Sequence, residues 1–542
     1  MKFLKIVVSL VFIVLLVTEA SAQRRPKYKA DKVEYHGRGK VKFRKLLGNV
    51  VFSHESTVVK CDSAYQYPRD NKLEAFGRVH IKDGDSVTIT SKKLIYDGAE
   101  RMALLREDVV YRSGSRTLYT DVLDYNLDSE IADFRQNGKL LDAENVLTSR
   151  SGTFYSLANY AIFYKNVKLV SPDYDLESDT LEYSTTTKIA ITKGPTNIIT
   201  EDNTTVYSEG GEFKTTVEIS VFEDGVIESE DYILEGDEIY LDDATKFYKA
   251  IGNVKLISKK EDMIIVGEEG IYQRDDGISK IFGNPVMKKV MEKDTFFLAA
   301  DTLVAIESDI EADERILAYY KVKMFKSNLQ GKCDSVSYFL SDSMITMYND
   351  PLLWNEGSQM ESDSIDLLLV DEVIDRMVMT KNAFLVSQDT LGQFNQIKGR
   401  SMTAFFKEGV INAMDIEGNG ESLYFALEGD SIAIGMNKIL CSSMRIRFRD
   451  SKLTNISFYT QPEAQLIPPH EWDPSNMALE GFVWRIQERP TLEDVAHYYR
   501  KEDADEEKEV LESSLENPPA IPEQLISPKD VDLKQLKRII LD

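Results

Sequence analysis

The chain has 542 residues, of which 42% are hydrophobic and 29% charged, and 91 Asp and Glu against 65 Lys and Arg give a net charge of −26. This amount of apolar material can form a large buried core, which excludes a wholly disordered chain. The acidic excess argues against nucleic-acid binding, because phosphates are neutralised by Lys and Arg.

Residues 1–22 are typical of a secretory signal peptide. Two lysines precede an apolar run from Ile6 to Val17, and Ala20-Ser21-Ala22 supplies a small-x-small cleavage pattern. A single membrane anchor is the alternative, but the run is shorter than the ~20 residues that span a bilayer. No Cys follows it, which argues against a lipoprotein. We therefore expect cleavage before Gln23 and export, followed by a basic leader and a first strand over residues 23–44.

Three cysteines, Cys61, Cys333 and Cys441, are too few for a disulfide scaffold in an exported chain of this size. We expect three buried thiols. A Cys61–Cys333 bond is not expected. Each of the two residues precedes an Asp-Ser pair, and these pairs are equivalent positions of a sequence repeat, described below, that lie far apart along the chain. There is no CxxC and no metal-ligand spacing, so we expect no metal site and no cofactor.

A short phrase recurs along the chain: Asp, then Ser or Thr, then apolar-x-apolar. Copies lie at residues 62–64, 179–183, 301–305, 334–338, 363–367 and 430–434, with a looser one at 121–125. Their separations are multiples of about 30 residues, which indicates a repeat architecture.

A second phrase alternates with the first and consists of a polar or small pair followed by apolar-x-apolar. Copies lie at residues 48–52, 77–81, 107–111, 165–169, 252–256 and 320–324, with variants at 349–354 and 382–386. Alternation with period two predicts half-buried strands. We interpret the Gly-Asn, Asp-Gly and Asn-Asp pairs as tight turns between short strands, two or three to a unit.

These patterns predict an all-β fold with two facing antiparallel sheets built from stacked repeats between about residues 30 and 470. One face of each strand would line a continuous apolar interior. The candidate interior residues are Val50, Phe52, Val79, Ile81, Leu94, Tyr96, Val109, Tyr111, Leu123, Tyr125, Val167, Leu169, Leu181, Tyr183, Val254 and Leu256. The interior is either a dry core or a groove that admits apolar chains, and periodicity alone favours the dry core.

The recurring Asp-Ser/Thr pair is compatible with a nucleophile, but none of the five His lies beside a copy to act as its base. The alternative is that these side chains satisfy backbone groups at bends. No carboxylate pair stands out among sugar-binding aromatics either. We therefore expect no catalytic residues and no enzyme activity.

Residues 75–81 and 85–97 resemble the OstA-like (organic-solvent-tolerance) module of the periplasmic bridge that carries lipopolysaccharide to the outer membrane. Residues 45–200 match it well, and weaker copies run to about residue 450. The length and the signal resemble the large OstA-like proteins of Bacteroidota-type bacteria, which lack the outer-membrane barrel.

The resemblance implies an elongated, taco-like open β-jellyroll in the periplasm, with lipid acyl chains in the apolar groove and sugars and phosphates outside. It implies lipopolysaccharide or a related glycolipid as ligand, and other bridge jellyrolls as partners through edge-strand pairing. With it, the lipid groove is favoured over the dry core. The basic leader is then a disordered start or a contact for lipid phosphates. The alternative function is an exported structural β-solenoid with a dry core.

The jellyroll is expected over residues 45–200, continuing over 201–470, and a charged tail with short helices over 471–542. Thr491 would cap a helix from Leu492 to Arg500, and residues 533–541 could form another. The tail is either solvated or a docking segment for a partner.

Overall fold

The computed structural model describes residues 27–497, apart from residues 39–40, 55, 86, 143–144, 185, 202, 215–216, 231, 261, 292–293, 309, 311–312, 356, 371–372, 408, 430, 450–451 and 461. The predicted signal peptide and the tail beyond residue 497 lie outside the described residues. The predicted all-β, antiparallel fold is confirmed. None of the described helices is long and apolar enough to cross a membrane.

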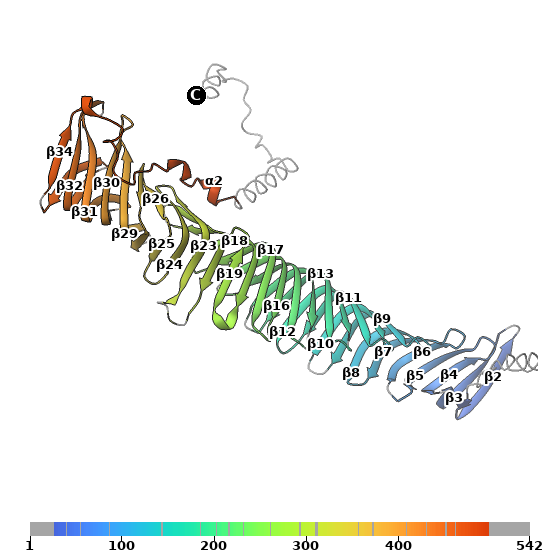
Figure 1. Ribbon diagram of the computed structural model, residues 1–542. Coiled ribbons are helices and arrows are strands. Elements are labelled where there is room, and N and C mark those ends of the chain that lie inside the picture. The colour runs from blue at the N-terminus through green and yellow to red at the C-terminus, as the bar shows by residue number, and fades with distance from the viewer. Residues whose placement is uncertain are drawn as a thin grey trace, which may run out of the picture. The chain divides into compact units, whose positions relative to one another are not determined.

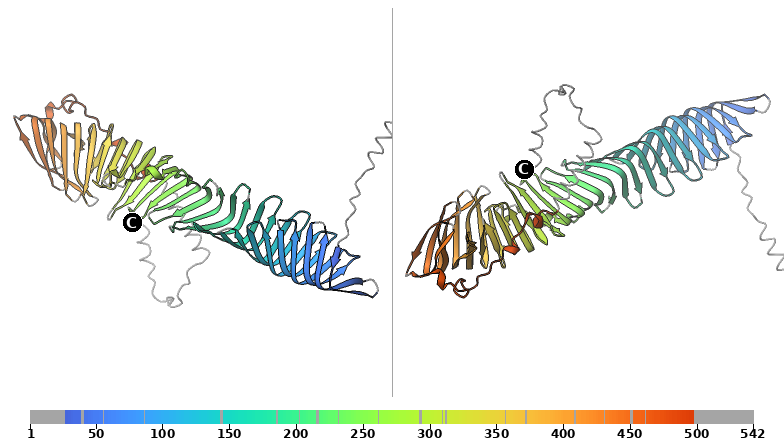
Figure 2. Two further views of the ribbon diagram at one scale, coloured as in Figure 1. Left: turned by 90° about the horizontal axis from the view of Figure 1, so that it is seen from below. Right: turned by 90° about the horizontal axis from the view of Figure 1, so that it is seen from above.

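The chain divides into two compact units. Of the described residues, unit 1 holds 27–290 together with 301–319 and 337–344, and unit 2 holds 291–300, 320–336 and 345–497. Within each unit the strands lie side by side (Figures 1 and 2). In both units the strands are antiparallel and largely follow one another in chain order. Each hairpin therefore adds its inner face to that of the preceding one.

Unit 1 begins with β1 (Lys27–Lys29) and β2 (Lys32–Arg38), which both pair with β3. The strands that follow are long. They are β3 (Val41–His54), β4 (Thr57–Tyr67), β5 (Lys72–Asp83), β6 (Val87–Asp97), β7 (Met102–Ser113), β8 (Arg116–Asn126), β9 (Ile131–Asp142), β10 (Asn145–Tyr155), β11 (Tyr160–Val170), β12 (Tyr174–Ser184), β13 (Ile189–Thr200), β14 (Thr205–Lys214), β15 (Ile219–Glu228), β16 (Tyr232–Asp242), β17 (Phe247–Ser258) and β18 (Met263–Gln273). The shorter β19 (Ile278–Phe282), β20 (Val286–Val290) and β22 (Thr302–Ile306) complete the unit.

Unit 2 begins with short strands, continues over residues 373–449 with long ones, the longest of the described strands among them, and ends with two shorter ones. They are β21 (Thr295–Ala299), β25 (Met344–Tyr348), β26 (Leu352–Asn355), β27 (Ser358–Glu361), β28 (Ser364–Val370), β29 (Val373–Gln388), β30 (Phe394–Lys407), β31 (Val410–Glu428), β32 (Ile432–Arg449), β33 (Lys452–Tyr459) and β34 (Glu463–Ile467). Residues of β23 (Arg315–Lys326), β24 (Leu329–Phe339) and β25 are divided between the two units.

Of the polar pairs that we predicted as turns between strands, most lie inside the strands instead. Asn349-Asp350, between β25 and β26, and Asp97-Gly98, where β6 ends before β7, do lie between strands as predicted. Gly48 and Asn49, with φ of 76° and 44°, are in the middle of β3, and Gly77 and Arg78, with φ of 72° and 41°, are in β5. Pairing continues on both sides with a register shift, so each pair is a bulge that bends the strand. We call this bend the corner. The strands are therefore longer than predicted, and each repeat contains two of them.

The Asp of the recurring phrase lies against the corner of a neighbouring strand. Asp62 accepts hydrogen bonds from Arg78, with an N–O distance of 2.7 Å, and Asp363 accepts one from Asn382 of β29 at 2.9 Å. A Cβ atom added to Gly77 would lie 2.5 Å from Asp62 Oδ2. The carboxylate thus occupies the space that glycine leaves, which supports a structural role for the phrase.

The position before this Asp, or before the residue that replaces the Asp in other repeats, holds a small buried residue whose side chain bonds within the strand. Ser91, Ser149 and Ser178 each donate a hydrogen bond to the carbonyl two residues later, at 3.1, 3.1 and 3.2 Å. Cys61 and Cys333 occupy the same position, and all three cysteines are free and buried. Burial raises the pKa of the Cys61 thiol to about 11 and that of Cys333 to about 12, so both stay protonated at neutral pH.

In unit 2 the chain returns over its own strands after β34. Residues 468–497, which we call the strap, carry the short helix α2 (Leu492–Val495) at their end. Thr491 caps this helix in a capping box with Asp494, as predicted for its start. The predicted end at Arg500 lies outside the described residues.

Three buried glutamines hold the strap. Gln396 on β30 donates to the Met477 carbonyl at 3.0 Å and accepts from the Leu479 amide at 2.8 Å. Gln359 on β27 binds the Val483 carbonyl and the Arg485 amide in the same way, at 2.8 and 2.7 Å. Gln330 on β24 accepts from Arg489 at 2.8 Å. The side-chain amides of Gln396 and Gln359 therefore pair with the strap backbone as a neighbouring strand would, whereas Gln330 binds a side chain of the strap.

Candidate functional site

The apolar interior of unit 1 is formed by the inner faces of successive strands on both sides of the corner. In β5, Leu73 and Ala75 precede the corner and Val79 and Ile81 follow it, and all four are buried. This alternation repeats in β7 and β9, because side chains of a strand point to opposite faces in turn. One buried cluster extends from Leu46 in β3 to Leu181 in β12.

The structure places all sixteen predicted interior residues on this inner face or at its margin. Twelve are buried, with 6% or less of their surface exposed: Val50, Phe52, Val79, Ile81, Leu94, Val109, Tyr111, Leu123, Tyr125, Val167, Leu181 and Val254. The other four, Tyr96, Leu169, Tyr183 and Leu256, are half-buried and lie close to the ends of their strands.

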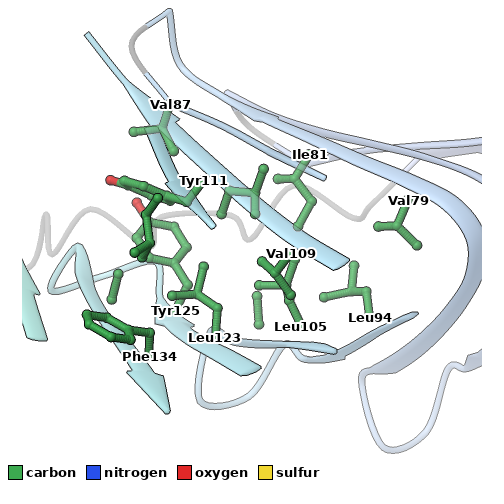
Figure 3. Packing of buried hydrophobic residues seen from close by; sticks show 14 of the residues in the cluster. Val79, Ile81, Val87, Leu94, Leu105, Val109, Tyr111, Leu123, Tyr125 and Phe134 are labelled. Carbon is green, nitrogen blue, oxygen red and sulfur yellow. The ribbon is translucent and has the colours of Figure 1, made fainter. Parts of the chain in front are cut away.

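The two layers of strands meet in the interior (Figure 3). Ile81, Val87 and Tyr111 come from one layer and face Leu94, Leu123 and Phe134 of the other. Away from the corner the rings of Tyr111 and Tyr125 lie side by side, with their centroids 6.3 Å apart. Burial raises the pKa of the Tyr125 phenol, which therefore stays neutral. The interior thus carries no charge at this point.

A row of alternating aromatic residues and alanines crosses one layer. In register, Tyr96 pairs with Ala103, Ala103 with Tyr125, Tyr125 with Ala132 and Ala132 with Phe154. The row continues through Ala161, Tyr183, Ala190 and Phe213. Sequence reasoning had found only its tyrosines. It missed Phe154, Phe213 and the alanines, although their spacing of about 29 residues was a usable signal.

Sequence reasoning also missed two of the largest interior side chains of unit 1, Phe134 and Phe163. Phe134 and Phe163, each 1% exposed, have ring centroids 6.3 Å apart, and Phe154 meets Phe163 edge to face at 5.6 Å. The signal was the alternation in Ala132-Asp133-Phe134. Its Ala and Asp do not resemble the Val-x-apolar phrase, so the pattern was overlooked.

The outer face of the same strands is polar and ion-paired. Asp124 accepts from Arg106 at 2.7 Å, and Asp108 lies 2.6 Å from Lys92. Hydrogen bonds from Lys193 and Tyr160 lower the pKa of the Glu182 carboxyl, which stays ionised. A strand of unit 1 therefore presents hydrocarbon inside and charge outside, an arrangement that suits a ligand with apolar chains and a polar headgroup.

The described residues offer little support for catalysis or metal binding. Within residues 27–497 as described, no three of His, Cys, Asp and Glu gather in a way that could hold a metal ion. The Asp side chains of the recurring phrase bind the corner instead. What the interior offers chemically is apolar surface, and burying a lipid chain there contributes about 0.8 kcal/mol per CH₂ group.

Comparison with known proteins supports the resemblance found in the sequence. Residues 27–179 match the family model of the OstA-like proteins. This confirms the predicted resemblance over that part of unit 1. No curated protein matches the chain.

Among solved structures, the chain is similar to the crystal structure of LptH, the LptA-homologous periplasmic component of the lipopolysaccharide transport device from Pseudomonas aeruginosa. The match has 14% identity and covers 19% of this chain and 79% of that one, with a TM-score of 0.18.

Proposed function

We propose that this protein is a periplasmic, lipopolysaccharide-binding component of the transport bridge to the outer membrane. It shields the acyl chains in the apolar interior of unit 1 and acts without catalysis. The observation that carries the proposal is the continuous buried cluster from β3 to β12, with ion-paired residues on the outer face of the same strands. The OstA-like family match over residues 27–179 supports the same conclusion.

Lipid entry requires the two layers to part on the side away from the corner. Tyr96, Leu169 and Tyr183 lie there half-buried, so that side is the least tightly closed. An acyl chain inserted between the layers replaces apolar contacts between the layers with apolar contacts to the lipid. The free energy gained by burying the acyl chain compensates for that lost when the layers separate. Because similar side chains recur at each repeat, a chain would meet nearly the same environment as it slides.

The second candidate is a structural scaffold with a dry core. One observation favours it: twelve of the sixteen candidate residues are almost completely buried against protein. A closed interior of this kind is also what a β-solenoid with no ligand would have. The two candidates differ in whether lipid reaches the inner face.

Photo-crosslinking in living cells separates them. Tyr96 and Ile95 are neighbours in β6, both half-buried, and point to opposite faces, as do Tyr183 and Glu182 in β12. A crosslinking residue at Tyr96 or Tyr183 should label lipopolysaccharide, whereas one at Ile95 or Glu182 should not. Equal labelling on both faces would indicate surface association only. No labelling by a folded, abundant protein would favour the scaffold.

A charge at the margin of the interior gives an independent test. Tyr183→Glu places a carboxylate on the inner face, where an unpaired charge costs several kcal/mol in apolar surroundings. Tyr183 suits this change better than Tyr125, since Tyr125 is only 1% exposed and a charge there would unfold the protein. We expect lipid to accumulate at the inner membrane while the variant stays folded.

We also propose other bridge jellyrolls as partners. β1 and β2 lie at the N-terminal end of unit 1 and both pair with β3, which makes them edge strands within the described residues. Edge strands offer backbone groups to an incoming strand. Cysteine crosslinking from Glu34 on β2 to candidate partners would test this pairing.

A further inference from the structure

The inner face of unit 1 changes character at β13 and β14. Phe134, Phe163 and residue 192 are successive members of one interior row, 29 residues apart in the sequence, and the third is Thr192. On the other side of the corner, the position held by Val167 in β11 is held by Thr196 in β13. At two interior positions that are apolar in the preceding repeat, β13 therefore carries threonine.

Four buried residues with hydroxyl groups lie on the two sides of the corner in these strands. Ser178, Thr196 and Ser208 lie opposite one another on three adjacent strands, β12, β13 and β14. Thr192 precedes Thr196 on the same strand, before the corner. Their exposed fractions are 7, 1, 0 and 2% in the order Ser178, Thr196, Ser208, Thr192. We call these four residues the hydroxyl rung.

Two of the four hydroxyls are satisfied by protein. The Ser178 and Thr196 hydroxyls lie 3.1 Å apart, and each also has a backbone carbonyl within reach as acceptor for its single proton, that of Thr180 for Ser178 and that of Gly194 for Thr196. The hydroxyls of Thr192 and Ser208 have no hydrogen-bond partner among the described residues. Ser208 therefore departs from Ser149 and Ser178, which occupy the same corner position in earlier repeats and donate to the carbonyl two residues on.

Burying a hydroxyl without a partner is unfavourable, and a dry interior would be more stable with Val and Ala at these places. We propose that Thr192 and Ser208 bind an oxygen atom carried by the acyl part of the lipid, an ester or amide carbonyl or a hydroxyl, and hold the lipid at the hydroxyl rung. This inference rests on the proposed function, since it requires lipid in the interior of unit 1.

The hydroxyl rung lies between two apolar clusters of the interior, a position that suits a site at which a lipid is held. One apolar cluster ends at Leu181, and a separate one contains Leu176, Ile198, Val206 and Phe222. A pure hydrocarbon segment gains less at the hydroxyl rung than in either cluster, whereas a segment with an acceptor oxygen gains a hydrogen bond there. The hydroxyl rung would therefore select the part of the lipid that carries oxygen.

The stability of the free protein gives the first test. Thr192→Val and Ser208→Ala remove unpaired hydroxyls, so the melting temperature should stay unchanged or rise. Thr120→Val and Ser149→Ala are matched controls at buried positions whose hydroxyls are paired, that of Thr120 with the Asn137 carbonyl at 2.9 Å. The controls should lower the melting temperature. A similar drop for Thr192→Val and Ser208→Ala would overturn the inference, because it would mean that these hydroxyls have partners without lipid.

Binding of two simple probes gives the second test. Methyl palmitate and hexadecane have similar apolar chains, but only the ester has acceptor oxygens. Native mass spectrometry of the mature protein should show a preference for the ester of roughly five- to tenfold, the value of about one hydrogen bond. The double variant Thr192→Val/Ser208→Ala should lose this preference, and Ser149→Ala should keep it.

The outcomes separate this inference from the proposed function. If wild type and double variant bind both probes with the same preference, the hydroxyl rung does not recognise oxygen, and the lipid-binding interior still stands. If neither probe binds any form of the folded protein, the proposed function itself fails.

Discussion

Units 1 and 2 use the same bent strands but bury them differently. In unit 1 a strand such as β5 buries one face, and its other face is half-buried or exposed. In unit 2 all four residues of β26, Leu352–Asn355, are buried, and so are Ala383, Phe384, Leu385 and Val386 of β29. Successive side chains point to opposite faces, so these strands of unit 2 are covered on both sides.

The strap accounts for the second covered face. The corner pair of β29 is Lys381 and Asn382, both at positive φ. Ala383 and Leu385 follow this pair at the same spacing at which Val79 and Ile81 follow the corner pair of β5, so Ala383 and Leu385 lie on the inner face. Phe384 and Val386 point the other way and pack in one cluster with Leu479 of the strap. Trp472 of the strap lies edge to face on Phe425, with centroids 5.1 Å apart. A third layer is thus what allows apolar residues on the outer face of unit 2.

This difference bears on function. The outer face of unit 1 is ion-paired and has no need of a cover, whereas that of unit 2 is apolar and is sealed by the chain itself. We therefore expect unit 2 to behave as a braced scaffold and unit 1 to supply the more open interior. The following changes test this comparison.

Removing a large buried ring should have the greatest effect. Phe134→Ala in unit 1 and Phe425→Ala in unit 2 each create a cavity, at a cost of about 3–5 kcal/mol. Hydrogen exchange measured by mass spectrometry should show that only Phe425→Ala increases exchange in residues 468–489. If Phe134→Ala loosened the strap equally, or Phe425→Ala left it unchanged, the comparison would be wrong.

Removing a glutamine that holds the strap should have a smaller effect. Gln396→Ala leaves the Met477 carbonyl and the Leu479 amide without their partner, which costs about 1–3 kcal/mol. Gln388→Ala is the control, because Gln388 is an exposed neighbour that contacts Gly392 outside the strap. Limited proteolysis should cut the strap faster in Gln396→Ala only. Equal rates in both variants would contradict the role of the glutamine.

The corner offers a test in unit 1. Gly77→Ala and Gly84→Ala both place a side chain at positive φ, 72° and 58°, at about 1–2 kcal/mol each. At Gly77 the new Cβ also meets Asp62 Oδ2 at 2.5 Å, whereas nothing lies within 4 Å at Gly84. Thermal unfolding should therefore show the larger loss for Gly77→Ala. Equal losses would mean that the carboxylate moves aside freely.

The sequence predicted those parts of the fold that rest on alternation. Val79, Ile81, Leu94 and Leu123 follow period two, and this was enough to place them inside. The corner was mistaken for a turn because Gly-Asn pairs favour both, and only strand pairing on each side distinguishes a bulge from a chain reversal.

Other features could not be predicted, for different physical reasons. Gln330, Gln359 and Gln396 look like surface residues in the sequence, and their burial depends on contacts with the strap more than eighty residues away in the chain. The hydroxyls of Thr192 and Ser208 look like any others in a strand. Their lack of a partner is a property of three-dimensional packing and leaves no mark on periodicity.

Acid should release the strap, with the smallest of the expected effects. Hydrogen bonds from Arg485 and then Lys332 lower the pKa of Glu488 to about 2, and hydrogen bonds from Lys323 and then Thr491 lower that of Asp494 to about 2. Both values lie below those of the free side chains, near 4.3 for Glu and 3.9 for Asp. The stabilisation is therefore complete above about pH 5 and is lost as the pH falls toward 2.

Tryptophan fluorescence should report this release, because all three tryptophans of the chain lie in or beside the strap. Trp472 and Trp484 belong to it, and Trp354 pairs with both Gln330 and Gln359. Emission should shift to the red between pH 5 and 2. Glu488→Gln with Asp494→Asn should remove most of that dependence.

A third carboxyl, that of Glu361, acts in the opposite direction. Burial raises its pKa, so Glu361 takes up a proton at a higher pH than Glu488 and Asp494, and its protonation stabilises the bound strap. Glu361→Gln removes this compensation and should make the loss of the strap with falling pH steeper. Because the Glu488 and Asp494 side chains are 28% and 37% exposed, solvent screens their ion pairs and the shift should be modest. An unchanged pH profile in the double variant would mean that the glutamines and aromatic rings hold the strap without these charges.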